Sequence, residues 1–265
     1  MRRTIVLLAA FAALVTTGCR DDHVTIAYQP RRGTTFTYAI HVTSSTTDSF
    51  PDRPASQPPG VPADFTARHQ VLDAQDGTTR VEVRLAREGG GERTFIMRFD
   101  RAAQLTAVES VEGIPAEALG SLGLSEIFPA AAGAPPDRPL RPGDHWVIDD
   151  QVQLAGMDAP TRLTGTGHLV QLGVIDGHKT ATVSSATVLP LTSTSTTANG
   201  VQTLTGTQTT TITVVYDLAD GSVRQSTSAT TGQFDVLLAP PAGQPGVPIR
   251  GALTVELRSE IRRTS

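Results

Sequence analysis

The sequence contains side chains that could act as nucleophiles, acids or bases, but their spacing does not match the enzyme motifs that use them. A serine hydrolase of the nucleophile-elbow type requires Gly-x-Ser-x-Gly, whereas the nearest string, Gly-Ser-Leu-Gly at residues 120–123, has the wrong spacing. The only lysine, Lys179, follows Asp176-Gly177 and His178, a context that matches no phosphate-binding or Schiff-base motif. We therefore expect no catalytic residue and no enzymatic activity.

Histidines are the next source of chemistry, because imidazole is a common metal ligand. Six histidines are scattered along the chain, without a His-Glu-x-x-His string. His168 and His178 lie on either side of the turn pair Asp176-Gly177 and could face each other across a hairpin, which would make a weak metal site. Two surface histidines on a hairpin explain the same spacing, so we expect no metal and no cofactor.

Three carboxylates surround the only tryptophan: Asp144 precedes Trp146, and Asp149 and Asp150 follow it. An acid and base pair beside an aromatic platform is an arrangement that glycosidases use. The alternative is structural, with Trp146 pointing inward from a strand and the aspartates solvated at the two ends of that strand. We favour the structural interpretation and expect Trp146 in the core or in the wall of a cavity.

The composition favours strands and argues against a nucleic-acid partner. Threonine occurs 37 times in 265 residues, and β-branched residues suit strands better than helices. The formal net charge is -4, and no basic tract is present. Recognition of nucleic acid needs a basic surface, so we expect no nucleic acid among the partners.

The first residues have the features of an export signal. Arg2 and Arg3 precede an apolar run of eleven residues, 5–15, which is too short to span a membrane. We therefore expect residues 1–18 to be a signal peptide. Cys19 is the only cysteine, so the chain has no internal disulfide.

The end of this leader resembles the lipobox of bacterial lipoproteins. The string is Thr16-Thr17-Gly18-Cys19, and it departs from the family pattern at Thr16, where Leu, Val or Ile is preferred. The resemblance implies acylation of Cys19 with a diacylglycerol anchor, so that residues 19–23 form a lipidated tether. The alternative is that Cys19 follows a conventional cleavage site by chance. The anchor implies an extracytoplasmic protein, on the periplasmic face of a membrane or on the cell surface, with the membrane as a partner through its acyl chains.

Apolar and polar residues alternate in several segments of the mature chain, which is the pattern of strands with one buried face. The segments are 36–42, 81–85, 95–99, 212–216 and 253–257. Asp-Gly or Asn-Gly pairs at 76–77, 176–177, 199–200 and 220–221 favour tight hairpins. Together these features predict an antiparallel sheet. The Thr-rich stretch 192–211 is predicted to be a polar hairpin, with an O-glycosylated patch as the alternative.

One stretch, 115–128, has apolar residues at helical spacing, and we expect a helical connector over 114–128. The segments on either side, about 24–110 and 144–262, both contain Gly-x-x-aromatic, then Asp-Gly, then aromatic-Asp. This order predicts a duplicated β-unit, although such strings are also common at strand starts and turns. The expected fold is mainly β (α+β): a single domain over 24–265, formed by a curved antiparallel sheet or half-barrel of about eleven strands, with short helices between the halves.

A resemblance follows from the Gly-Asp-His-Trp string at 143–146 after a proline-rich approach, the paired Asp-Gly turns and the lipobox. Together they resemble an uncharacterised family of bacterial lipoproteins, with an architecture similar to the half-barrel lipid carriers of the LolA, LprG and LppX type. The resemblance covers nearly the whole mature chain. It implies a curved sheet able to hold an acyl chain, and it implies no catalytic residue.

A twisted sheet of about eleven strands curls, and one or two short helices supply too little bulk to fill its hollow side. We therefore expect an apolar cavity on the concave face under the helix, and non-enzymatic binding of a lipid or another apolar molecule. The alternative is a structural or protein-interaction lipoprotein with a filled interior, and an envelope hydrolase is a more distant third. The expected lining residues are Phe36, Tyr38, Ile40, Trp146, Val214, Tyr216, Val255 and Leu257.

Overall fold

The structure is a computed structural model that describes residues 23–51, 53–56, 60–87, 89–103, 105–112, 114–115, 134–152, 160–197, 200–241 and 246–265. All regular secondary structure in these ranges is β-strand, so the chain is mainly β, as the alternating segments predict. Within these ranges no helix is long and apolar enough to cross a membrane. The strands are β1 (Thr35–Phe50), β2 (Arg53–Ser56), β3 (Val61–Gln75), β4 (Thr78–Arg87), β5 (Glu92–Phe99), β6 (Leu105–Val111), β7 (Ile114–Pro115), β8 (His145–Val152), β9 (Thr161–Ile175), β10 (His178–Thr197), β11 (Gly200–Asp217), β12 (Val223–Ala239) and β13 (Ile249–Arg263).

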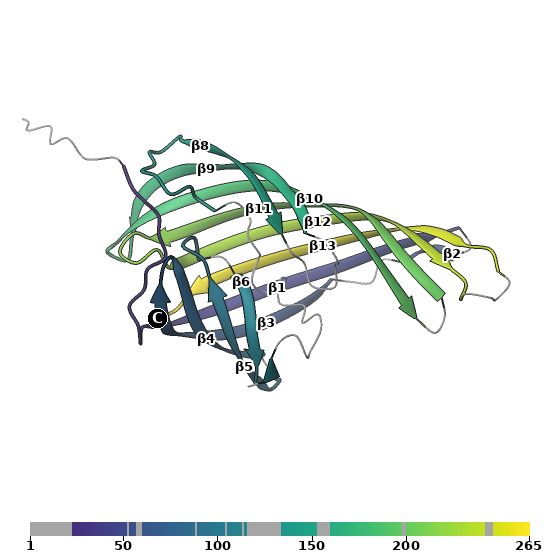
Figure 1. Cartoon of the computed structure of the whole chain (residues 1–265), viewed down its shortest axis with the longest axis horizontal. Helices are drawn as coiled ribbons and strands as arrows, with labels where there is room; N and C mark the ends of the chain where they lie inside the picture. The colour runs from purple at the N-terminus through teal and green to yellow at the C-terminus, as the bar shows by residue number, and fades with distance from the viewer. Residues whose placement is uncertain are drawn as a thin grey trace, which may run out of the picture.

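The strands form one antiparallel open sheet (Figure 1). Its order is β7-β6-β5-β4-β3-β1-β13-β12-β11-β10-β9-β8, with β2 paired to β1 off this path. The first and last strands lie side by side within the sheet, where β1 pairs with β13 from Tyr38 opposite Arg263 to Ser49 opposite Ala252. The described residues thus contain thirteen strands where the sequence predicts about eleven. The difference includes β2 and β7, which are too short to show a period of two.

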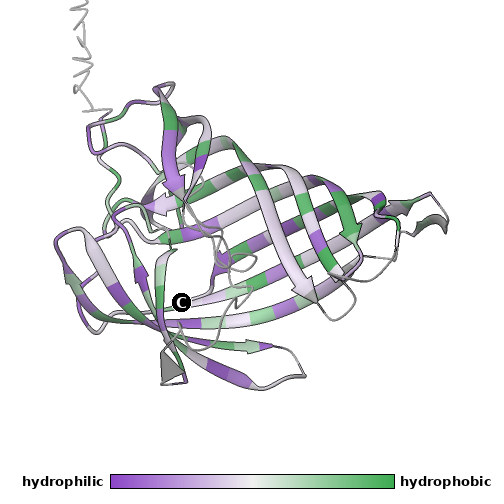
Figure 2. Cartoon of the chain, turned by 45° about the vertical axis from the view of Figure 1, so that its right-hand side comes forward, coloured by the Kyte–Doolittle hydropathy of each residue, from purple (hydrophilic) through white to green (hydrophobic). Residues whose placement is uncertain are grey.

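Local sequence explains the hairpins. Asp76 and Asp176 both adopt a φ of 50°, and the glycines that follow them, Gly77 and Gly177, have φ of 75° and 80°. Left-handed conformations at both central residues are what a type I′ turn requires, and its twist matches that of the flanking strands. The polar hairpin is also present, because β10 pairs with β11 along their lengths, ending with Thr197 opposite Gly200. Figure 2 shows hydrophilic and hydrophobic residues alternating along the strands.

The sheet bends until strands that are distant in its order touch. Tyr216 on β11 donates a hydrogen bond from its hydroxyl to the carbonyl of Ala102, just after β5, over 3.3 Å. Ala103 and Val223 each pack against both large apolar clusters. Since six other strands separate β6 from β11 in the sheet, these contacts show how strongly the sheet curves (Figure 1).

Two apolar clusters make most of the core. The first is built on the inward faces of β1 and β3–β6 and includes Phe36, Val81 and Met97, which are fully buried. The second is built on β9–β11 and includes Leu169 and Val183. A third, smaller cluster is formed by Ile148, Leu163 and Leu189. Each half of the sheet therefore has its own packing, and the two large clusters meet where the sheet bends.

The segment that follows the expected tether is part of the fold. Val24 forms a bridge with Leu140, and the backbone amide of Tyr28 donates to the carbonyl of Arg101. The Arg101 guanidinium in turn donates to the carbonyls of Ile26 and Pro135. Ile26 and Tyr28 are both buried. The chain is thus held in the core within a few residues of Cys19.

The structure changes one prediction and leaves two others outside its described residues. Ile114 and Pro115, where the helical connector 114–128 was expected to begin, form strand β7 and pair with Val111 and Ser110 of β6. A helical start at these two residues is therefore wrong, because their backbone extends the neighbouring hairpin. Residues 116–128, as well as the leader and Cys19, lie outside the described residues.

The two halves share backbone details at their first strands. Gly33 and Gly143 both have a left-handed φ, 84° and 91°, which glycine adopts without strain. Their amides donate to the carbonyls of Val71 on β3 and Leu169 on β9, over 2.8 and 2.7 Å. The same turn thus leads into β1 and into β8, with the same contact to the next strand.

Candidate functional site

An apolar cavity lies on the inner face of the curved sheet. About 90 Å³ of the cavity is open to water-sized molecules. The space between its atoms is about 780 Å³ when the open solvent at its mouth is included. One buried water needs roughly 10–15 Å³ on the first measure, so several waters or a short apolar chain fit inside. The described lining residues are Tyr28, Tyr38, Ile40, His69, Phe99, Ala102, Ala103, Leu105, Ile212, Val214, Tyr216, Val223, Ser226 and Ile261.

The cavity exists because the bend of the sheet brings two groups of strands together. β1, β3, β5 and β6 supply one wall, and β11, β12 and β13 supply the other. The hydrogen bond from Tyr216 to Ala102 joins the two walls. Tyr28, which lies ahead of the first strand, completes the lining. The cavity therefore depends on contacts between residues that are more than a hundred positions apart.

His69 is the one ionisable nitrogen base among the described lining residues. Its ring lies between those of Tyr38 and Phe99, with centroid distances of 4.8 and 5.8 Å. Burial lowers the pKa of His69 to about 3, because the charged imidazolium would lose its hydration there. The imidazole is therefore neutral at physiological pH and brings no positive charge to the cavity.

Three tyrosines are among the residues that line the cavity. Burial raises the pKa of Tyr28, Tyr38 and Tyr216 above its usual value near 10, so all three stay protonated. A second contribution to Tyr38 comes from Arg263, whose positive charge lowers the pKa and opposes the effect of burial. The tyrosines thus act as neutral hydrogen-bonding groups in an otherwise apolar lining.

Ser226 on β12 differs from the other polar residues of the lining. Its side chain is 4% exposed, and its Oγ has no hydrogen-bond partner among the residues that the structure describes. Two positions further along the same face, the Ser228 Oγ makes a 2.8 Å hydrogen bond to the Ser259 Oγ of β13. A buried hydroxyl without a partner loses its hydration and gains nothing in return. Ser226 thus brings to the lining a buried hydroxyl whose hydrogen-bonding capacity is unused among the described residues.

The residues predicted to line a cavity divide into two groups. Tyr38, Ile40, Val214 and Tyr216 lie in the lining. The other four lie outside the lining. Phe36 is fully buried in the first cluster, and Leu257 packs against that cluster. Trp146 packs against the second and third clusters, and Val255 is partly buried on β13 opposite Gly232.

Alternation alone could not separate these two groups. Phe36 and Tyr38 share one face of β1, yet only the second reaches the cavity. His69 and Ser226 also line the cavity but were not among the predicted lining residues. His69 had a usable signal, since it stands between Ala67 and Val71 on the buried face of β3. A histidine at an inward strand position is informative because ionisable groups are seldom buried.

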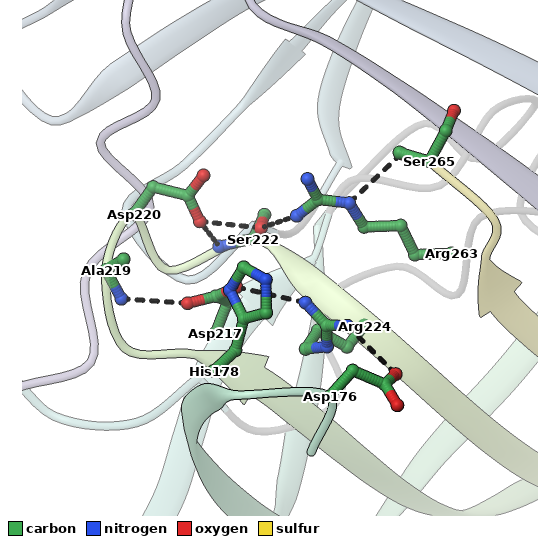
Figure 3. Close-up of polar contacts among 9 residues, drawn as sticks. All are labelled: Asp176, His178, Asp217, Ala219, Asp220, Ser222, Arg224, Arg263 and Ser265. Carbon is green, nitrogen blue, oxygen red and sulfur yellow. Dashed lines mark hydrogen bonds and ion pairs between the residues drawn. The ribbon is translucent and has the colours of Figure 1, made fainter. Parts of the chain in front are cut away.

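A polar network holds the turn between β11 and β12 (Figure 3). Asp217, whose side chain is 3% exposed, accepts a hydrogen bond from the Ala219 amide at 3.0 Å and pairs with the His178 Nδ1 at 2.9 Å. Arg224 lies 3.3 Å from both Asp217 and Asp176, which links this turn to the turn between β9 and β10. Buried carboxylates need such partners, so the network fixes the end of the sheet beside the cavity.

The same figure shows why Ser222 does not join His178 and Asp217 in a relay. The Ser222 Oγ donates to the Asp220 Oδ1 over 2.6 Å and accepts from the Arg263 Nη1 over 3.0 Å (Figure 3). His178 pairs instead with Asp217. A Ser-His-Asp relay needs the serine hydroxyl bonded to the histidine, whereas the Ser222 hydroxyl is bonded to a carboxylate and a guanidinium.

The histidine pair that the sequence suggested does not form. His168 lies opposite His145 on β8, with ring centroids 5.1 Å apart, whereas His178 pairs with Asp217. The reason is register: His178 is the first residue after the turn and lies opposite Ile175, whereas His168, further from the turn, lies opposite Ser184 on β10. Among the described residues, no group of three or more His, Cys, Asp or Glu side chains could hold a metal ion.

Two of the three carboxylates around Trp146 have structural partners. Arg162 on β9 donates from Nε and Nη2 to both oxygens of Asp149, over 2.6 and 2.7 Å, and this pairing lowers the pKa of Asp149. The Arg141 amide donates to Asp144 over 3.0 Å, which lowers the pKa of that carboxyl as well. Asp150 is exposed on β8. The contacts agree with the structural interpretation of this group.

Comparison with known proteins adds no relative. No model of a known protein family matches the chain, and no curated protein sequence is similar to it.

Proposed function

We propose that this protein is a membrane-anchored envelope lipoprotein that binds an apolar ligand or lipid, without catalysis, in the concave face of its sheet. The observation that supports the proposal most is the cavity, whose lining is apolar apart from a few neutral hydroxyl and imidazole groups. Sites for small apolar molecules typically combine an apolar wall with a few polar groups that fix orientation. The volume open to water-sized molecules is about 90 Å³, below the range of about 300–1,000 Å³ that sites for drug-sized molecules occupy, so the cavity suits a short apolar chain better than a bulky ligand.

The anchor in this proposal is the diacylglycerol on Cys19, and its support is the lipobox-like string at residues 16–19. Val24 is already paired with Leu140, so about five residues separate the acyl chains from the folded sheet. An extended chain spans about 3.5 Å per residue, which limits the tether to roughly 17 Å. The proposed arrangement keeps the binding cavity close to the membrane surface, where apolar molecules are available.

We also propose that the sheet is a half-barrel made of two copies of one β-unit. Phe36 and Trp146 lie at matching positions, the third residue after Gly33 and Gly143 respectively. Phe36 stands opposite His69 on β3, and Trp146 stands opposite Gly167 on β9. His69 and Gly167 each lie two residues before the residue that receives the glycine's hydrogen bond. Superposition of residues 33–100 on 143–217 should place the Phe36 and Trp146 rings together. If the two rings lie at unrelated positions, the duplication proposal is wrong.

Binding is tested with the chain from residue 20 onward, which retains every described residue and lacks the lipid anchor. Titration with the uncharged fluorescent probe N-phenyl-1-naphthylamine should give saturable binding at one site. Val214→Trp fills the cavity from β11 and should abolish it, whereas Val174→Trp, at a residue 67% exposed on β9, should leave it unchanged. Far-UV circular dichroism checks that both variants retain the sheet.

Failure to saturate with wild-type protein would reject the proposal in favour of a structural or protein-interaction lipoprotein with a filled interior. Equal binding by the wild type and by a folded Val214→Trp variant would place the probe elsewhere and reject this cavity as the site.

A further inference from the structure

The lining of the cavity combines apolar surface with neutral hydrogen-bonding groups and lacks charge. None of the described lining residues is Arg, Lys, Asp or Glu. The His69 imidazole is neutral because burial lowers its pKa, and the three tyrosine hydroxyls stay protonated. A carboxylate or phosphate placed here would lose its hydration without gaining a partner of opposite charge. An uncharged polar group has a much smaller penalty, which a hydrogen bond can offset.

Arg263 lies close enough to the lining residue Tyr38 to lower the pKa of its hydroxyl, but the Arg263 guanidinium already has partners. Its Nη1 donates to Ser222 over 3.0 Å, its Nε donates to the carbonyl of Ser265 over 3.1 Å, and its Cζ lies 4.6 Å from the centre of the Phe36 ring. The Ser222 hydroxyl is in turn bonded to the Asp220 carboxylate, which offsets the positive charge. An anionic head at Arg263 would have to replace these contacts.

Resting on the binding function proposed above, we infer that the ligand is a molecule with one apolar chain and an uncharged hydroxyl or ester head, and that this head hydrogen-bonds to the Ser226 Oγ. The Ser226 hydroxyl is buried in the lining and has no partner among the described residues. It can donate to an ester carbonyl or accept from an alcohol. The cavity has a volume of about 90 Å³ open to water-sized molecules, which is small for a ligand site and favours one chain over two.

The inference is tested by displacement of N-phenyl-1-naphthylamine with ligands that share a twelve-carbon chain and differ in the head. At pH 7.5, dodecanol and methyl laurate should displace the probe at concentrations at least about tenfold lower than the concentration of laurate that is needed, since only laurate brings a charge. Ser226→Ala should weaken the binding of dodecanol by about fivefold, the factor for one hydrogen bond of about 1 kcal/mol. The affinity for the probe itself should stay the same. Ser228→Ala, on the same face of β12 but outside the lining, is the matched control and should change neither value.

The outcomes separate the two proposals. If the probe does not bind, the binding function itself fails. If the probe binds but laurate competes as well as dodecanol, the binding function stands and the uncharged-head inference is overturned; loss of laurate binding in Arg263→Gln would then place an anionic head at that guanidinium. If dodecanol is preferred but Ser226→Ala binds it as the wild type does, the assignment of the head to Ser226 is wrong.

Discussion

His69 makes the stability of the fold depend on pH below neutrality, because burial lowers the pKa of its imidazole. The unfolded chain binds a proton at an ordinary histidine pKa near 6.5, whereas the folded protein keeps His69 neutral down to about pH 3. Between these values the unfolded state holds more protons, so the free energy of unfolding must fall as the pH falls. The effect is small at pH 7, grows below 6.5 and ends near pH 3.

The magnitude follows from the difference between the two pKa values. At pH 5 the solution is about 1.5 units below the unfolded pKa, and each unit corresponds to about 1.36 kcal/mol. His69 should therefore remove about 2 kcal/mol of stability between pH 7 and pH 5. Ordinary carboxyl groups titrate mostly below pH 5, which makes this window suitable for a histidine.

Urea unfolding followed by circular dichroism at pH 7 and pH 5 measures the loss directly. His69→Phe keeps an aromatic ring between Tyr38 and Phe99 but cannot bind a proton, so its loss over this window should be smaller by about 2 kcal/mol. Val174→Phe, which adds an aromatic ring at an exposed position on β9, is the control and should lose as much stability as the wild type over this window. An equal loss in His69→Phe and the wild type would refute the assignment of a neutral buried imidazole.

Three further predictions concern the anchor and two packing sites. Cys19→Ser should yield an unprocessed or released protein, and intact-mass analysis of the wild type should show a lipid on a chain that begins at Cys19; a mature chain without added lipid mass would contradict the anchor. Gly167→Ala should lower the free energy of unfolding by about 1–3 kcal/mol and shift the tryptophan emission, because a Cβ at 167 would overlap the Trp146 ring. An unchanged spectrum and stability would show that the ring does not lie over this glycine. Ser226→Ala should cost less than about 0.5 kcal/mol, since its hydroxyl has no partner among the described residues, whereas Ser228→Ala should cost about 1 kcal/mol through the lost bond to Ser259. Denaturant titration compares the two, and a larger loss in Ser226→Ala would mean that its hydroxyl is bonded in the folded protein.

Much of the strand content could be predicted from short-range sequence patterns. The alternation at 36–42, 81–85 and 95–99 falls within β1, β4 and β5, and the Asp-Gly pairs at 76–77 and 176–177 form the expected turns. These features are local: a strand has a period of two, and a left-handed turn selects Asp and Gly within two residues. The antiparallel arrangement followed from the same facts, because short turns can connect only antiparallel neighbours.

The short elements and the connector show where such patterns stop being informative. β2 has four residues and β7 has two, which is fewer than a period needs in order to be recognised. Ile114 and Pro115 were assigned to a helix on the spacing of apolar residues that follow them, yet they pair with β6. Propensity is a weak guide at the end of an element, where a neighbouring strand can override it.

Only the tertiary structure decided which inward residues surround the cavity. The sequence placed Phe36 and Tyr38 on one face of β1, but their separate roles depend on β11 and β12, which reach them through the bend of the sheet. The pairing of β1 with β13 joins residues more than 200 positions apart, and no local pattern encodes it. The importance of His69 and Ser226 has the same origin: sequence determines which face of a strand a side chain occupies, whereas burial and the lack of a partner depend on what the curved sheet brings opposite that face.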